Sequence, residues 1–368
     1  MHRAVKSLAI VVVVLLAVAI AAGYVCTRQS VVVPHIIVQS GQAAPLTATH
    51  TFLFENSKIT ISVPVDAEVY DGAKATDKSV SIYGNVSEST WVADSYLAMV
   101  NDSAQDQMYA NLLGQFRKIQ NDRNLTSDEY LELMTVYVQS LTYETTPDNP
   151  AKYPVETVVD GSGDCDDKSL LLAGLLSREG YRVALLSFSP ESHMALGVGS
   201  TASPYRDTGY AYLETTNLSY VGVQPDELTG GIVLASEPLV IPVGSGTTLY
   251  TSGEETAALQ AMSLAAEEKA KALEPKISSL SSDLTAKQNR IQQLEAQMQS
   301  LRSAGNVGAY NAQVSTHNAL VSEYNTELAA YRNLVSTYDT NAQVHNYIVT
   351  HAYDRNGTWA WAQANMPV

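Results

Sequence analysis

The chain has 368 residues, and its 45% of hydrophobic residues are enough for a buried core of one substantial domain or two modest domains. It carries 22 basic against 38 acidic residues, a net charge of −16, and no basic stripe, which argues against nucleic-acid binding. Its two cysteines, Cys26 and Cys165, lie far apart in the sequence. A framework of structural disulfides is therefore excluded.

The N-terminal segment Ser7–Cys26 carries no charge and is long enough to span a bilayer as one helix. Arg3 and Lys6 precede it, so the positive-inside rule places the N-terminus in the cytoplasm. We predict a single-pass anchor in the cell membrane with the bulk of the chain extracytoplasmic. A cleaved signal peptide is the alternative, and it also exports the chain.

Alternating apolar residues in Thr51–Val65 predict a β-hairpin around a polar centre. Helical spacing follows over Asp94–Asp122, and a second helix is expected from Thr126 to Leu141, because Thr126 and Glu129 form a capping box. The three prolines of Tyr143–Pro154 predict a loop.

The central stretch places Cys165 between a glycine-containing turn and the apolar helical run Ser169–Ser177, which Gly180 ends. Three short apolar segments follow, and their lengths and turn residues predict an antiparallel meander packed on that helix. The segments are Arg182–Phe188, His193–Gly199 and Tyr210–Thr215.

Beyond Glu254 the pattern becomes that of long helices. Apolar residues recur in three- and four-residue steps from Pro275, which we expect to begin a helix, to Leu301 and again from Tyr310 to Tyr338. Gly305–Gly308 separates the two runs. We predict an antiparallel coiled-coil hairpin, with a protein as its candidate partner.

The chemistry of the central stretch points to a cysteine nucleophile. A helix N-terminus favours the thiolate, and Asp164 is a good N-cap that would make Cys165 the first helical residue. The N–H of Cys165 is then available to an oxyanion. His193 opens a later strand and is the candidate base, with Glu214 as its orienting acid.

Ordinary structural roles compete with this assignment. Cys165 is alternatively an inert core cysteine, His193 a structural histidine, and Glu214 a surface carboxylate. Asp164, Asp166 and Asp167 raise the question of a cation site, but acidic residues in a first helical turn ordinarily complement the helix dipole. We therefore expect no metal and no other cofactor. The same carboxylates oppose formation of a thiolate.

The order and local sequence of these residues resemble the transglutaminase-like superfamily, which has a papain-like core, and in particular its membrane-anchored microbial type. Six segments carry the resemblance, namely Pro154–Thr157, Gly161–Asp167, Ser169–Leu176, Gly180–Val183, His193–Val198 and Tyr212–Thr216. The resemblance implies Cys165 as nucleophile, His193 as base and Glu214 as orienting acid. The family more often has aspartate at the third position and an aromatic residue where Met194 stands.

The family's upstream oxyanion donor has three candidates here, Gln139, Tyr143 and Tyr153, and the sequence does not choose among them. The resemblance implies an α+β fold in which the cysteine begins a helix packed on an antiparallel sheet. The expected organisation is a stub and transmembrane anchor (1–27), a linker (28–50), a transglutaminase-like domain (51–245), a coiled-coil hairpin (254–345) and a tail (346–368).

The predicted function is that of an extracytoplasmic thiol enzyme acting on the amide carbonyls of protein or peptide substrates. A thioester intermediate is expected, with hydrolysis favoured over transamidation because water is always available. The alternative is a non-catalytic surface module that uses the same fold and its helical hairpin for binding.

Overall fold

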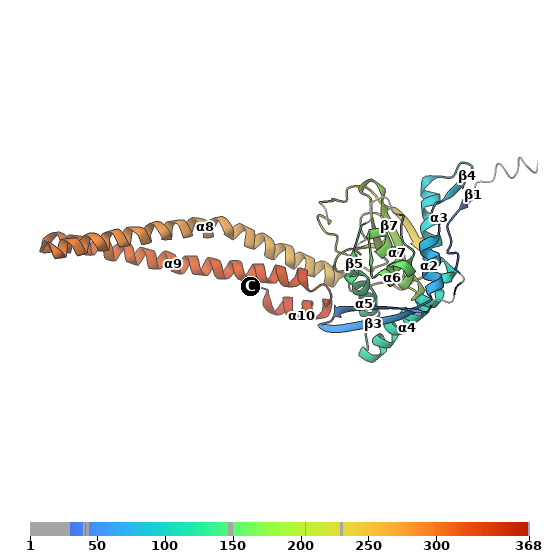
Figure 1. Ribbon diagram of the computed structural model, residues 1–368. Helices are drawn as coiled ribbons and strands as arrows, with labels where there is room; N and C mark the ends of the chain where they lie inside the picture. Colours follow the sequence, from blue (N-terminus) through green and yellow to red (C-terminus); the bar gives the residue numbers. More distant parts are fainter. Residues whose placement is uncertain are drawn as a thin grey trace, which may run out of the picture. The chain divides into compact units, whose positions relative to one another are not determined.

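The computed structural model describes residues 30–39, 41, 44–145, 150–202, 204–228 and 231–366. The chain forms two compact units, Met1–Thr256 and Ala257–Val368. The first contains all of the strands in the described ranges, and the second is helical. Figure 1 shows the elements in sequence colours.

The first unit is organised around helix α7 (Cys165–Arg178) and an antiparallel sheet with the strand order β10-β7-β8-β9. These strands are β7 (Val183–Phe188), β8 (His193–Val198), β9 (Ala211–Leu213) and β10 (Leu239–Val243). Helix α7 packs on β7 and β8 through an unbroken buried stretch, 167–176, whose residues from Leu170 to Leu176 are apolar. This is the meander predicted from the sequence, with β10 added beside β7.

A long β-hairpin lies outside this sheet and is confirmed where the alternation predicts it. Its strands are β2 (Leu46–Phe54) and β3 (Ser57–Val65), in antiparallel register from Leu46↔Val65 to Phe54↔Ser57. Every second side chain of β3 is buried, as expected for a strand with one solvated face. A separate two-stranded sheet pairs β1 (Ser30–Val32) with β4 (Ser81–Tyr83).

Several helices surround α7. They are α2 (Ala67–Ala75), α3 (Glu88–Asn101), α4 (Asp106–Arg123), α5 (Ser127–Ser140) and α6 (Pro154–Asp160). The capping box of Thr126 and Glu129 at the start of α5 is confirmed. The sequence pattern missed α2 and α6, which are short and lack a long apolar stripe.

The single helical region predicted over 94–122 is two helices. A 3₁₀ turn, Ser103–Gln105, separates α3 from α4. Asp102 causes the break, because its extended backbone ends α3 and its carboxylate accepts a hydrogen bond from the N–H of Ala104 at 3.0 Å. A side chain that caps a new turn competes with continuation of the old helix.

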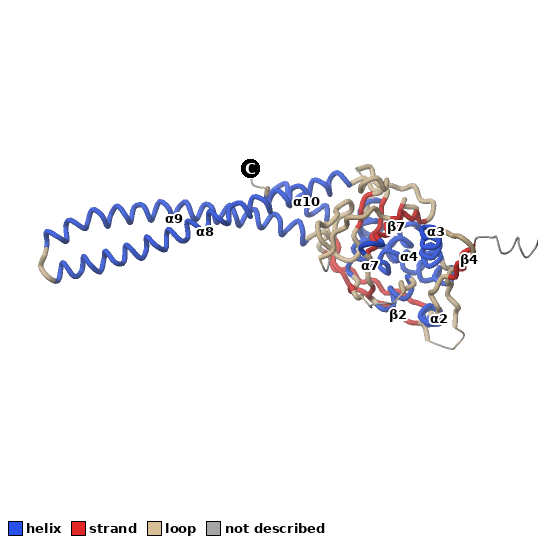
Figure 2. The backbone as a smooth tube through the Cα atoms, turned by 90° about the horizontal axis from the view of Figure 1, so that it is seen from above, coloured by secondary structure: helices blue, strands red, loops and turns tan. Residues whose placement is uncertain are grey.

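The second unit contains most of α8 (Gly253–Ser303), together with α9 (Val307–Thr350) and α10 (Arg355–Asn365). Figures 1 and 2 both show α8 and α9 side by side. Several side-chain contacts join them, among them Ser263 with His345 at 3.0 Å, Lys287 with Glu323 at 3.5 Å, and Glu295 with His317 at 3.2 Å. Residues later in α8 contact residues earlier in α9, so the two helices run antiparallel.

Two details of the helical region differ from expectation. Pro275 lies inside α8 and does not begin a helix, because the preceding segment, rich in alanine and glutamate, has a helix propensity that outweighs the loss at one proline. The predicted tail contains α10, whose Trp361 ring stacks on Tyr347 of α9 with centroids 3.7 Å apart. The sequence pattern did not predict α10, because its sequence is short and largely polar.

The predicted fold class included an N-terminal transmembrane helix, and this part is corrected. Within the described residues, no helix is long and apolar enough to cross a membrane. The segment Ser7–Cys26, on which the prediction rested, lies outside the described residues. The fold class is therefore α+β with small sheets, without an assigned membrane helix, and export of the chain stays a prediction.

Gly174 of α7 provides a test of how tightly this helix is packed. A Cβ at this position would overlap the Tyr109 hydroxyl, and the Arg178 guanidinium covers the Tyr109 ring at 3.8 Å, so the ring has little room to move. We expect Gly174→Ala to lower the free energy of unfolding by about 1–3 kcal/mol. Urea unfolding followed by circular dichroism measures the change.

Gly114 of α4 is the matched control, because a Cβ there would meet nothing within 4 Å. We expect Gly114→Ala to raise the free energy of unfolding by about 0.5–1 kcal/mol through helix propensity alone. Equal effects of the two substitutions would show that α7 is not packed as described.

Candidate active site

Cys165 is the first residue of α7. Asp164 is the N-cap, and its carboxylate forms a reciprocal capping box with Asp167, as the sequence predicted for Asp164. Gly161 has φ +66°, in the left-handed region that favours glycine. A Cβ on Gly163 would lie 2.6 Å from the Cβ of Asp167, so only glycine fits there. The turn before Cys165 thus requires both glycines.

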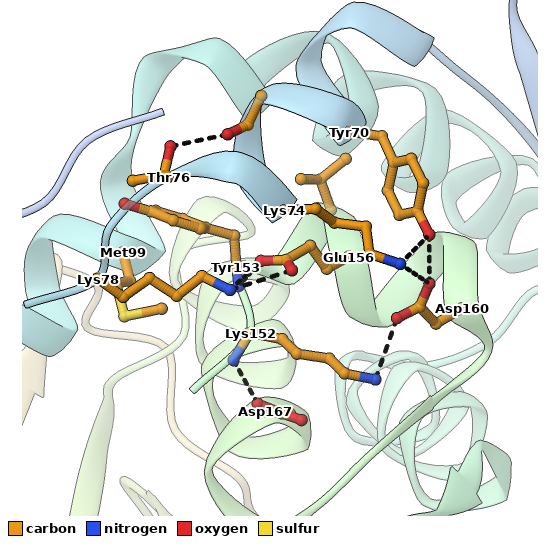
Figure 3. Close-up of polar contacts among 12 residues, drawn as sticks. Tyr70, Lys74, Thr76, Lys78, Met99, Lys152, Tyr153, Glu156, Asp160 and Asp167 are labelled. Carbon is orange, nitrogen blue, oxygen red and sulfur yellow. Dashed lines mark hydrogen bonds and ion pairs between the residues drawn. The ribbon is translucent and has the colours of Figure 1, made fainter. Parts of the chain in front are cut away.

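Helix α6 packs on α7 next to this turn. Figure 3 shows the side-chain contacts that hold α6 in place. Glu156 forms an ion pair with Lys78 at 2.8 Å, and both side chains are less than 10% exposed. Tyr70 of α2 donates a hydrogen bond to Asp160 at 2.6 Å. The N–H of Lys152 donates to Asp167 at 2.6 Å, which ties the segment before α6 to the first turn of α7.

The thiol of Cys165 faces the start of β8. Its sulfur lies 3.9 Å from the carbonyl oxygen of Ser192, and the backbone of Met194 also hydrogen-bonds to it. The thiol therefore contacts the residues on both sides of His193. Burial, followed by the charge of Asp166, raises the pKa of Cys165 to about 12, so the thiol carries its proton at neutral pH.

His193 and Glu214 form a hydrogen-bonded pair that is almost entirely buried. His193 Nε2 lies 3.3 Å from Glu214 Oε2, and the Glu214 side chain is 1% exposed. Tyr212 donates to the same carboxylate oxygen at 2.6 Å and lies 3.4 Å from His193 Nε2. Among the described residues, no hydrogen bond engages the other ring nitrogen, Nδ1, which leaves it available for a proton.

The second oxygen of Glu214 is also fully engaged. Oε1 accepts hydrogen bonds from the N–H groups of Thr215 and Thr216 at 3.0 and 2.9 Å, and from the Thr216 hydroxyl at 2.6 Å. Burial opposes ionisation, but the hydrogen bonds and the charge of His193 outweigh it and lower the pKa of Glu214 to about 2. Glu214 follows β9 and does not belong to it, because the strand ends at Leu213.

The three aspartates of the first turn lie close together, with ligand oxygens within 4.8 Å of one another. Burial and a hydrogen bond with Asp164 raise the pKa of Asp166 well above its ordinary value. Burial, followed by the charge of Asp164, raises the pKa of Asp167 to about 6. The three neighbouring carboxylates thus disfavour one another's ionisation, and the charge of Asp166 also opposes a thiolate at Cys165.

Lys168 is a site residue that sequence reasoning missed. Its side chain is fully buried, and burial lowers its pKa to about 8. The ammonium donates to the carbonyl oxygens of Gln139, Leu141 and Thr216 at 3.1, 3.0 and 3.3 Å. It thereby joins α7, the end of α5 and the turn that carries Glu214. In the sequence it looks like an ordinary polar residue of a first helical turn.

The structure separates the three candidates for the oxyanion donor. Gln139 is engaged, because its amide nitrogen donates to the carbonyl oxygens of Glu214 at 2.7 Å and Ser219 at 3.0 Å. Tyr153 is fully buried at the start of α6, and its ring lies 5.7 Å from the Lys78 ammonium.

Tyr143 is the candidate beside the thiol. It lies in β5 (Thr142–Tyr143), opposite Gly163 of β6 (Ser162–Gly163), two residues before Cys165. Its side chain is 39% exposed, and burial followed by the charge of Cys165 raises its pKa to about 12. A protonated phenol next to the thiol is suited to donate a hydrogen bond to an oxyanion.

The structure thus brings Cys165, His193 and Glu214 into one site, keeps Tyr143 as a candidate donor, and adds Tyr212 and Lys168. These two additions share burial of a polar side chain, which a single sequence does not display. No family model, curated protein or solved structure matches this chain. The residues and their geometry therefore carry the functional argument alone.

Glu214→Gln tests whether the buried carboxylate is held as an ion. A carboxyl whose pKa falls from 4.5 to about 2 contributes about 3 kcal/mol of stability. This contribution is fully present above pH 4.5 and is lost as the pH falls toward 2. We therefore expect the variant to be less stable than the wild type at pH 6, and the difference to shrink at pH 4 and again at pH 3.

Urea unfolding at the three pH values measures this difference. Glu268→Gln, which removes an exposed carboxylate of α8, is the control and should change little. A difference for Glu214→Gln that stays constant from pH 6 to pH 3 would mean that Glu214 is not the ionised partner of His193.

Proposed function

We propose that the chain is a thiol enzyme that transfers or hydrolyses acyl groups of amides, with Cys165 as nucleophile, His193 as base and Glu214 as orienting acid. One observation carries the proposal: Glu214 holds His193 through Nε2, while the backbone flanking His193 contacts the thiol and Nδ1 has no partner in the described part of the chain. The same arrangement supports the resemblance to the transglutaminase-like superfamily.

The reaction begins with a neutral thiol. As the sulfur of Cys165 attacks the amide carbonyl carbon, its proton passes to Nδ1 of His193, and Glu214 stabilises the imidazolium that forms. The N–H of Cys165, which has no acceptor within its helix, and the Tyr143 hydroxyl are the donors proposed to stabilise the oxyanion. The imidazolium then gives its proton to the nitrogen of the leaving amine, the C–N bond breaks, and a thioester remains.

The thioester has two fates. Water, activated by His193, attacks the thioester carbonyl and releases a carboxylic acid together with the thiol of Cys165. An amine in place of water gives a new amide, which is transamidation. We favour hydrolysis, because water is always available and an acceptor amine needs a site of its own.

A non-catalytic binding module is the second candidate, and the high pKa of the Cys165 thiol, raised to about 12 by burial and Asp166, favours it. A thiol that stays protonated is a poor nucleophile without base assistance. In that case the fold and the α8–α9 hairpin would serve only to bind a protein partner. The reactivity of Cys165 therefore distinguishes the two functions.

The pH dependence of alkylation by iodoacetamide tests base assistance. In a Cys26→Ser background, Cys165 is the single thiol of the chain. With assistance from His193, we expect the rate to level off well below the pKa of the unassisted thiol. An unassisted thiol of this pKa would react about tenfold faster with each pH unit up to pH 10.

His193→Ala should lower the rate at pH 7 by about 100-fold, since the thiol then lacks its base. His317→Ala, on α9, is the matched control and should leave the rate unchanged. A wild-type rate that rises steadily to pH 10 and does not respond to His193→Ala would exclude the enzyme and favour the binding module.

A further inference from the structure

A cleft of about 610 Å³ borders the first turn of α7, where Asp166 lines it, and plays no part in the mechanism above. Its lining comes from segments far apart in the sequence: α3, β4 and the residues before it, the residues before α6, the first turn of α7 and the end of β7. The lining residues are Lys78, Val80, Ile82, Glu88, Trp91, Val92, Ser95, Tyr96, Met99, Pro150, Ala151, Asp166, Ser187 and Ser189.

Several residues that line the cleft lie near the reactive pair in the fold. Asp166, which lines it, is the residue after Cys165. Ser187 and Ser189 flank Phe188, which is paired with His193 across β7 and β8. Helix α3 packs on α7, and the charge of Cys165 is among the causes that raise the pKa of Tyr96. A substrate whose carbonyl reaches Cys165 therefore extends naturally into this cleft.

The chemistry of the lining indicates what it accepts. One wall is apolar and includes Trp91, Val92 and Met99 of α3. Lys78 is the single cation among the lining residues, and Glu156 already neutralises it. Glu88 and Asp166 supply acidic groups, so an acidic substrate side chain would meet repulsion and no free cation.

Hydroxyl groups also line the cleft. In the described part of the chain, no side-chain hydrogen bond engages the hydroxyls of Ser187 and Ser189, which leaves them available to the polar backbone of a peptide. An apolar wall with a few polar groups is the usual composition of a site that binds a side chain and orients its backbone.

We propose that this cleft is the acyl-donor subsite and that it takes a peptide with a bulky apolar side chain beside the scissile carbonyl, while it excludes an acidic one. The inference rests on the proposed function, because it assigns the substrate class of the same thiol. Trp91 is its specificity-determining residue.

Peptidyl acyloxymethyl ketones test the assignment, since the sulfur forms a thioether with the probe as its carboxylate leaves, and the thiol proton passes to the base. We use benzyloxycarbonyl-dipeptides that begin with alanine and end in phenylalanine, glycine or glutamate, on the Cys26→Ser protein. We expect labelling rates in the order phenylalanine, glycine, glutamate, with steps of roughly 10-fold. Iodoacetamide carries no peptide side chain that could bind in the cleft, so its labelling rate reports the reactivity of the thiol alone.

Trp91→Ala should slow the phenylalanine probe by roughly 10-fold and leave the iodoacetamide rate unchanged. Trp359→Ala, on α10, is the matched control and should change neither rate. Val92→Lys gives a second, independent readout, because a cation in the apolar wall should accelerate the glutamate probe relative to the phenylalanine probe. Circular dichroism confirms that each variant is folded.

The outcomes separate the two proposals. Slow iodoacetamide labelling of the wild type that does not depend on His193 overturns the proposed function, and this inference with it. Rapid, His193-dependent iodoacetamide labelling with equal rates for the three probes, or with probe ratios that neither Trp91→Ala nor Val92→Lys changes, overturns the subsite alone.

Discussion

A buried carboxylate is the constraint on which the site depends. Glu214 is ionised although its side chain is 1% exposed, and an ion without water must be compensated by hydrogen bonds and an opposite charge. Thr215 and Thr216 satisfy one oxygen, and Tyr212 and His193 satisfy the other. The requirement to compensate one charge thus fixes the orientation of the imidazole that the reaction needs.

The same requirement organises the surrounding chain. Lys168 binds the Thr216 carbonyl from α7, and Gln139 binds the Glu214 carbonyl from α5, so the turn after β9 is held from two helices. Cys165 lies one helical turn before Lys168 and is placed by the same packing. The burial that fixes this geometry also keeps the Cys165 thiol protonated. The reactivity of Cys165 therefore depends more on proton transfer to a base than it would if the thiolate were already formed.

Much of the site follows from the sequence, because its signals are local. A glycine turn, a capping aspartate and an apolar run are sufficient to place Cys165 at a helix start, and short apolar segments place His193 on a strand. Lys168 and Tyr212 were missed because their burial depends on partners far away in the sequence, such as Gln139 for Lys168. The prediction that Pro275 begins a helix was wrong for a related reason, since the helix that contains it begins more than twenty residues earlier. The cleft is built from five separated segments, and no local pattern predicts it.

The tautomer of His193 tests the account most directly. Long-range ¹H–¹⁵N correlation spectra of the ¹⁵N-histidine-labelled protein distinguish a protonated from an unprotonated ring nitrogen. With Glu214 holding Nε2, His193 in its neutral form should carry its proton on Nε2 and leave Nδ1 free, and Glu214→Gln should weaken this preference. A neutral imidazole protonated on Nδ1, unchanged in Glu214→Gln, would contradict the proposed base.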